Sequence, residues 1–157
     1  MIEPSLCEGL QMLMRHEGFR PRAYDDATGE TVKAPEGRLT IGYGRNLADV
    51  GLRECEALFL LQKDIDFIYQ GLYNRYSWFS LLNTPRQWVC INMAYQMGLE
   101  GFASFKRMIG NLEVAVNDKK FHNRWVAVQN EMIDSQWAEN HKDRAYELGN
   151  AMIRGAW

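Results

Sequence analysis

Long apolar runs, paired cysteines and an excess of positive charge are all missing from this chain of 157 residues. No stretch approaches the roughly 18 consecutive apolar residues that a membrane-spanning helix needs. The first residues, Met1 to Pro4, contain no basic residue and no apolar run, so we expect no signal peptide. We therefore expect the protein to be made and folded in a cytoplasm, and to need another component for release if its target lies outside.

The charge balance argues against a strong nucleic-acid binder. Lys and Arg together number 18 and Asp and Glu 20, which gives a formal net charge of −2. Binding to nucleic acid without regard to sequence needs an excess of positive charge. The basic group Lys119, Lys120 and Arg124 is expected to be a solvated helix face, with contact to an anionic cell surface as the alternative. We predict no nucleic-acid partner.

The cysteines and histidines give no sign of a metal site. The three cysteines are Cys7, Cys55 and Cys90. They are odd in number and form no CxxC pair, and each lies among apolar residues, so we expect buried free thiols in a reducing compartment. The three histidines are scattered without the spacing of metal ligands. We predict no metal and no cofactor.

The composition is that of an ordinary globular protein. Apolar residues make up 46% and charged residues 24%, which excludes a disordered chain. A chain of this length buries roughly two thirds of its unfolded surface, enough for a core without disulfide or metal support. No repeat, low-complexity tract or linker interrupts the sequence, so we predict a single domain over residues 1–157.

Apolar spacing predicts a first helix, a small sheet and a long second helix. Ser5 and Glu8 have the spacing of a capping box, and the helix that follows is expected to run to about Glu17 and stop at Gly18. Short β-prone pieces at 22–24, 30–33 and 38–43 alternate with turn clusters, which predicts an antiparallel hairpin sheet. A long helix is expected over about 52–73.

The rest of the chain reads as helices, which makes the fold class α+β. Thr84 followed by Pro85 is typical of an N-cap with proline in the first helical position. The helix that follows this cap is apolar nearly all round from Trp88 to Met97 and is expected in the centre of the core. Further helices are predicted near 103–109, 113–117, 119–133 and 142–153.

Two carboxyl groups and a hydroxyl group lie near one another in the sequence of the N-terminal part. Glu17 is at a helix end, Asp26 is in a predicted hairpin turn nine residues later, and Thr40 is on the strand that follows. Glycosidic bond cleavage uses one protonated and one ionised carboxyl group. Glu17 has apolar neighbours, so we expect burial to favour its neutral form, whereas Asp26 in a polar turn stays ionised. Spacing alone leaves the alternative of two solvated carboxylates open.

Three separated blocks carry a more specific pattern: Glu17-Gly18 with Tyr24, Asp26, Gly29 and TIGYG at 40–44; TPR at 84–86 through INMAYQMG at 91–98; and Trp137, Asn140 and Arg144 with the closing GAW at 155–157. This pattern resembles phage-type lysozymes, the family of the T-even phage lysozyme, over nearly the whole chain. The resemblance implies a lysozyme-like fold with a β-hairpin lobe (about 18–50) and a mostly helical lobe (about 52–157 plus the N-terminal helix), joined by a long helix.

The resemblance also implies roles for single residues. Glu17 matches the catalytic acid, Thr40 the residue that helps to hold the attacking water, and Asp26 the catalytic Asp, because Tyr24 fixes the register of a Tyr-x-Asp pattern; Asp25 remains the local alternative. Four residues match positions that contact substrate or line the cleft: Tyr95, Gln96, Trp137 and Asn140. Arg144 matches a basic residue that pairs with the catalytic Glu.

The sequence departs from the family pattern in two places. It carries extra residues at 30–38, and it is much shorter between Asn46 and Leu52. Arg45 stands where the T-even enzyme has a His, and we predict that it pairs with Asp64 on the long helix. These departures affect the rim of the substrate groove and leave the three catalytic positions intact.

The resemblance indicates an endolysin that hydrolyses the β-1,4 bond between N-acetylmuramic acid and N-acetylglucosamine in peptidoglycan and so lyses the host cell. Two alternatives remain: a lytic transglycosylase, which would use Glu17 without a water-binding Asp26, and a peptidoglycan-binding module without activity. We expect a monomer that waits in the host cytoplasm, leaves through a holin-type pore and acts on peptidoglycan in the periplasm or cell wall.

Overall fold

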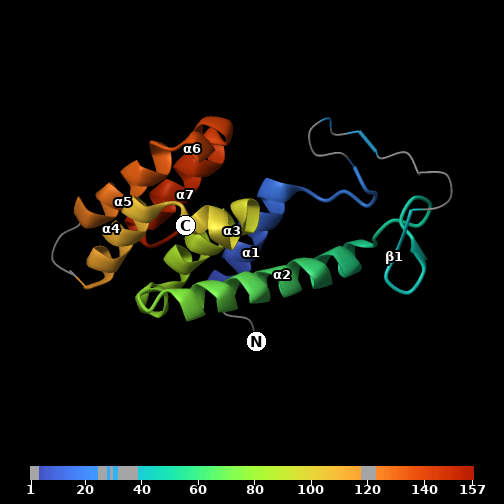
Figure 1. The fold of residues 1–157 in the computed structure, drawn as a ribbon, viewed down its shortest axis with the longest axis horizontal. Coiled ribbons are helices and arrows are strands. Elements are labelled where there is room, and N and C mark those ends of the chain that lie inside the picture. Colours follow the sequence, from blue (N-terminus) through green and yellow to red (C-terminus); the bar gives the residue numbers. More distant parts are fainter. Residues whose placement is uncertain (1–3, 25–27, 29, 32–38, 118–122) are drawn as a thin grey trace. The chain divides into compact units, whose positions relative to one another are not determined.

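A computed structural model describes residues 4–24, 28, 30–31, 39–117 and 123–157, with the side chains of the first helix from Glu8 onward. The chain forms two compact units, one made of residues 1–16 and 64–157 and the other of residues 17–63. The elements follow in the order α1 (Pro4–Glu17), β1 (Thr40–Ile41), β2 (Arg45–Asn46), α2 (Glu54–Arg75), the 3-10 turn η1 (Phe79–Leu81), α3 (Thr84–Ala103), α4 (Lys106–Asn117), α5 (Asn123–Ile133), α6 (Gln136–Asn140) and α7 (Lys142–Arg154) (Figure 1).

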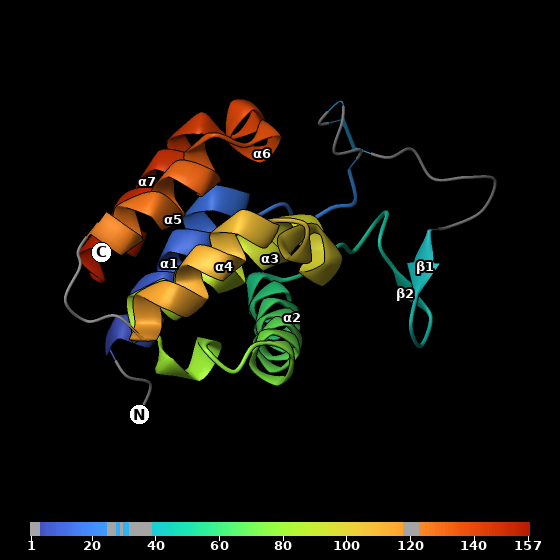
Figure 2. The same cartoon turned by 60° about the vertical axis from the view of Figure 1, so that its left-hand side comes forward.

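Helix α3 supplies the centre of the larger unit, as its apolar sequence predicts. Every residue from Trp88 to Ala94 is buried, including the polar Asn92 at 1% exposure. Helix α7 packs against α3 and α5, and α5 also packs against α4. Both views show α4, α5 and α7 grouped on one side of α3 (Figures 1 and 2). A helix without a polar face is stable only where neighbours cover it on all sides.

The two ends of α3 differ from the sequence prediction. The N-cap is Asn83, whose Oδ1 accepts a hydrogen bond from the backbone N–H of Arg86, so Thr84 is already the first helical residue. The predicted cap at Thr84 is therefore wrong by one residue. Gly98 has φ 76° and ψ 164°, which breaks the helix into two segments. Glycine takes this backbone conformation without the steric penalty of a side chain.

Helix α4 is one continuous helix where the sequence analysis predicts two short ones. Its buried residues Met108, Leu112 and Ala115 recur at helical spacing and lie on one face. Gly110 falls on the exposed face, so it interrupts the sequence pattern without interrupting the helix. The short helix α6 is also absent from the prediction, whereas α7 begins at the predicted residue. The predicted start of α5 at Lys119 lies outside the described residues.

The smaller unit holds the sheet, which confirms the α+β class. Strands β1 and β2 are antiparallel, with Thr40 opposite Asn46 and Ile41 opposite Arg45. Gly42 and Gly44 in the turn have φ of 59° and 84°. An isolated antiparallel bridge joins Tyr24 to Thr31, within the first two predicted strand pieces. The strand at Arg45–Asn46 was not predicted, because these residues have little β-propensity and pair only because the glycine turn reverses the chain.

The cysteine prediction is confirmed at one position and wrong at another. Cys90 in α3 is fully buried, and burial raises the pKa of its thiol. Cys55 in the first turn of α2 is exposed. Residues next to each other in a helix point to different sides, so the apolar neighbours of Cys55 along the chain do not cover it. No helix among the described residues is long and apolar enough to cross a membrane.

Candidate active site

Glu17 is the last residue of α1, where the sequence analysis places it. Gly18 follows with φ 69°, a left-handed conformation that ends helices. The structure corrects the expected burial, because Glu17 is exposed. The next apolar residue, Phe19, is itself 49% exposed and lies in the non-helical segment that follows α1. The side chain of Glu17 is thus accessible to solvent.

The last turn of α1 is tied to the helical unit immediately before Glu17. His16 Nε2 lies 2.8 Å from Oε2 of Glu147 in α7, and His16 Nδ1 lies 3.3 Å from Nδ2 of Asn92 in α3. Arg15 also forms an ion pair with Glu147. Burial raises the pKa of the Glu147 carboxyl, but the hydrogen bonds from His16 and Arg15 outweigh it and leave the pKa below its ordinary value.

Thr40 is exposed on β1, and the hairpin that carries it is anchored at its base. The backbone N–H of Leu47 donates to the carbonyl of Leu39 at 2.7 Å, and that of Leu52 donates to Pro21 at 2.7 Å. A Cβ on Gly51 would lie 2.2 Å from the Pro21 oxygen. These contacts join both ends of the segment between the helices, so the strand of Thr40 has a fixed support.

The predicted pair between Arg45 and Asp64 is wrong. Arg45 contacts Glu56 instead, with Nη1 2.8 Å from Oε1 and Nη2 2.7 Å from Oε2, and its Nε donates to the Gly51 carbonyl at 2.8 Å. The backbone N–H of Arg53 also donates to Glu56, and this bond is the largest cause of the lowered pKa of its carboxyl group. Asp64 lies eight residues further along α2 than Glu56, about 12 Å along the helix axis. Arg45, which contacts Glu56 in the first turn, therefore does not reach Asp64 as well.

Two of the predicted sugar-contacting residues meet in the helical unit. The indole Nε1 of Trp137 in α6 donates to Oε1 of Gln96 in α3 at 2.8 Å. Phe105 meets the Trp137 ring edge-on, with ring centroids 6.4 Å apart. Asn140 ends α6 and is exposed, and Arg144 is half-buried in the first turn of α7. Phe105 was not predicted as a site residue. The sequence feature that could have indicated it is an aromatic residue in the short junction between two helices, next to Ser104.

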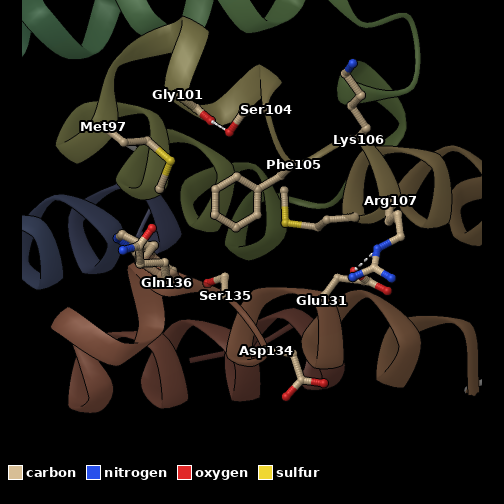
Figure 3. A pocket seen from close by; sticks show the side chains of 12 residues that line it. Met97, Gly101, Ser104, Phe105, Lys106, Arg107, Glu131, Asp134, Ser135 and Gln136 are labelled. Carbon is tan, nitrogen blue, oxygen red and sulfur yellow. Dashed lines mark hydrogen bonds and ion pairs between the residues drawn. The ribbon is translucent and has the colours of Figure 1, made fainter.

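Trp137 and Phe105 line a pocket of about 490 Å³ between the end of α3, the start of α4 and the end of α5. Figure 3 shows the Phe105 ring pointing into it, with Met97 on one side. Arg107 Nε pairs with Glu131 Oε2 at 2.9 Å at the rim. The pocket joins an aromatic wall to charged and hydroxyl groups, the chemistry that binds polar ligands with flat apolar faces.

Tyr95 lines a second pocket, of about 710 Å³, between α2 and α3. Asp64 and Phe67 of α2 form the opposite wall, and the helix break at Gly98 borders it. Tyr95 therefore lies with Asp64 at the second pocket, and Gln96 bonds to Trp137, which lines the first. Met97 of α3 borders both pockets.

The predicted site residues fall in different parts of the chain, and one of them is not described by the structure. Asp26 lies outside the described residues, as does most of the extra stretch 30–38. Glu17 and Thr40 belong to the smaller unit, and the residues predicted to contact sugar belong to the larger one. Within the described part of the chain, no group of three or more His, Cys, Asp or Glu side chains is placed to hold a metal ion.

A family model described as phage lysozyme matches residues 14–142, most of the chain. The chain belongs to the phage lysozyme family. No curated protein matches it at a significant level. The matched region of this phage lysozyme contains Glu17, Asp26, Thr40, Trp137 and Asn140, whereas Arg144 lies beyond its end. The family is one of muramidase-type endolysins, and it indicates glycoside hydrolase activity for this chain.

Proposed function

We propose that this phage lysozyme hydrolyses the β-1,4 bond between N-acetylmuramic acid and N-acetylglucosamine in bacterial peptidoglycan and thereby lyses the host cell. The observation that carries the proposal is the family match over residues 14–142, a range that includes Glu17, Asp26 and Thr40. Each position holds a residue that is competent for the reaction. The exposed carboxyl of Glu17 at the end of a well-packed helix supports its role, because a proton donor must reach the substrate.

In this mechanism Glu17 donates its proton to the glycosidic oxygen as the bond to the sugar C1 breaks. Asp26 accepts a proton from a water molecule, which adds its oxygen to C1. Thr40 holds that water through its hydroxyl. Because a directly attacking carboxylate would have no use for Thr40, we propose that the reaction inverts the anomeric centre. An initial α-anomer in proton NMR of the first product supports inversion, and an initial β-anomer contradicts it.

The substrate is proposed to lie against the aromatic residues of α3 and α6. Aromatic rings pack on the apolar faces of sugars, and the amide of Gln96 is oriented by Trp137 at 2.8 Å. Tyr95 and Asn140 are proposed to contact further sugar atoms, and Arg144 to pair with Glu17. We propose a monomer that remains in the host cytoplasm until a holin-type pore releases it to the periplasm or cell wall.

Replacing Glu17 by Gln tests the function most simply. The amide keeps the shape but has no proton to donate, so activity on purified peptidoglycan is expected to fall by about 10²–10⁴-fold. The side chain is exposed, so the free energy of unfolding should change by less than about 0.5 kcal/mol. Glu8→Gln, on the same helix and also exposed, is the matched control and should keep full activity.

Asp26→Asn separates hydrolysis from the transglycosylase alternative. A transglycosylase makes no use of a water-binding carboxylate, so it would tolerate this change, whereas the proposed hydrolase loses activity to a similar extent as Glu17→Gln. A binding module without activity would bind peptidoglycan and release no soluble fragments with any variant. Full activity of both variants would contradict the proposal.

A further inference from the structure

The contacts of His16 hold the final turn of α1 from two directions. One ring nitrogen faces Glu147 of α7 at 2.8 Å and the other faces Asn92 of α3 at 3.3 Å. The His16 side chain is only 10% exposed, and Asn92 is 1% exposed in the centre of the core. Two buried polar side chains in an apolar region are stable only when they are hydrogen-bonded to each other or to further partners.

The two partners fix the orientation of the ring. Nδ1 faces Asn92 Nδ2 in α3, and Nε2 faces the Glu147 carboxylate in α7. Arg15 also pairs with Glu147, so two side chains from the end of α1 meet one carboxylate of α7.

We propose that His16 is a positioning residue for the reaction: held between Glu147 and Asn92, it fixes the last turn of α1 and through it the carboxyl group of Glu17. This inference rests on the proposed role of Glu17 as the proton donor. The mechanism described above makes no use of His16, Asn92 or Glu147.

The place of His16 in the chain explains why such a support is needed. The last residues of a helix have carbonyl groups without intrahelical partners, and helix ends fray. Glu17 is the final residue of α1, and Gly18 after it adds no side-chain contact. A misplacement of about 1 Å of a reacting group costs about 10²-fold in rate. A side chain that pins the residue before Glu17 to two core helices reduces this motion.

The test compares His16→Ala and His16→Gln with a control in α5 that removes a different contact to α7. Gln129→Ala removes a hydrogen bond from Gln129 Nε2 to Asn150 Oδ1 of α7, 3.1 Å long, without touching α1. The kcat and KM of each folded variant are measured on soluble peptidoglycan fragments. We expect His16→Ala to lower kcat by about 10- to 100-fold with KM changed less than twofold, because positioning of the donor affects the chemical step.

His16→Gln should recover at least part of this kcat, because its amide N–H can donate to Glu147 and so keep the turn in place. Gln129→Ala should keep kcat within twofold. A kcat of His16→Ala within twofold of the wild type would overturn the proposal, as would equal losses in His16→Ala and Gln129→Ala. Glu17→Gln is measured in parallel: if it is inactive while His16→Ala is fully active, only the positioning role fails, whereas a fully active Glu17→Gln refutes the proposed function itself.

Discussion

Gly9, in the second turn of α1, has no room for a side chain. A Cβ at this position would lie 2.3 Å from Cγ and Cδ2 of Trp88 and 2.7 Å from its Cδ1. These separations are far below ordinary van der Waals contact. Trp88 is 3% exposed in the second turn of α3, so its ring cannot move aside into solvent. We therefore predict that Gly9→Ala forces α1 away from α3.

The size of the effect follows from two opposing contributions. Alanine is favoured over glycine inside a helix by about 1 kcal/mol, whereas adding a methyl group to a packed core costs typically 1–3 kcal/mol. The overlap here is with a rigid ring, so we take the upper end of this range, about 3 kcal/mol. The expected net loss is about 2 kcal/mol, or about 4–8 °C in Tm for a chain of this length.

Gly110→Ala is the matched control for this prediction. Gly110 is also inside a helix, but a Cβ there meets nothing within 4 Å. The propensity gain then stands alone, and Tm should rise by about 2–4 °C. Thermal and urea unfolding followed by circular dichroism measure both variants. If Gly9→Ala were as stable as the wild type, the close packing of α1 on α3 would be refuted.

Three further predictions concern the helical unit and the thiols. Arg86 donates two hydrogen bonds to the carbonyl oxygens of Met152 and Ile153 at the end of α7, at 2.8 and 2.9 Å, and stacks on the Trp125 ring at 3.6 Å. Lysine cannot reproduce these contacts, so Arg86→Lys should lower the free energy of unfolding, measured by urea titration, by about 1–3 kcal/mol. A loss below about 0.5 kcal/mol would contradict this. Iodoacetamide should label Cys55 in the native protein and leave Cys90 unlabelled until denaturant is added, as peptide mapping would show; native labelling of Cys90 would contradict its burial. The lowered pKa of Glu147, where burial is outweighed by the bonds from its partners, stabilises the fold above the ordinary glutamate value of 4.5, and this stability is lost as the pH falls through the lowered value. Glu147→Gln should therefore reduce the dependence of stability on acidic pH, and an unchanged dependence would contradict the assignment.

Elements with a strong local signal could be predicted from the sequence. The end of α1 at Glu17 follows from Gly18, and the central place of α3 follows from its apolar residues on every side. Both signals are local. One is a backbone conformation that only glycine adopts easily, and the other is a helix that lacks a polar face. The α+β class followed from the same kind of local pattern.

Contacts between distant residues could not be predicted in the same way. Arg45 was predicted to pair with Asp64, but its partner is Glu56, because the pairing depends on how far along α2 each acidic residue lies. The contact of His16 with Glu147 joins residues 131 positions apart, and no spacing rule links α1 to α7. The exposure of Glu17 also depends on which side chains approach it, and its apolar neighbours in sequence do not cover it.

Mass spectrometry of peptidoglycan digested by the wild-type protein tests the central claim most directly, with a Glu17→Gln digest as the control. The account predicts soluble fragments that end in a reducing N-acetylmuramic acid, formed by the wild type and not by the variant. Fragments with an anhydro-muramic acid end, one water lighter, would contradict hydrolysis and indicate a transglycosylase; free stem peptides would contradict glycosidic cleavage altogether.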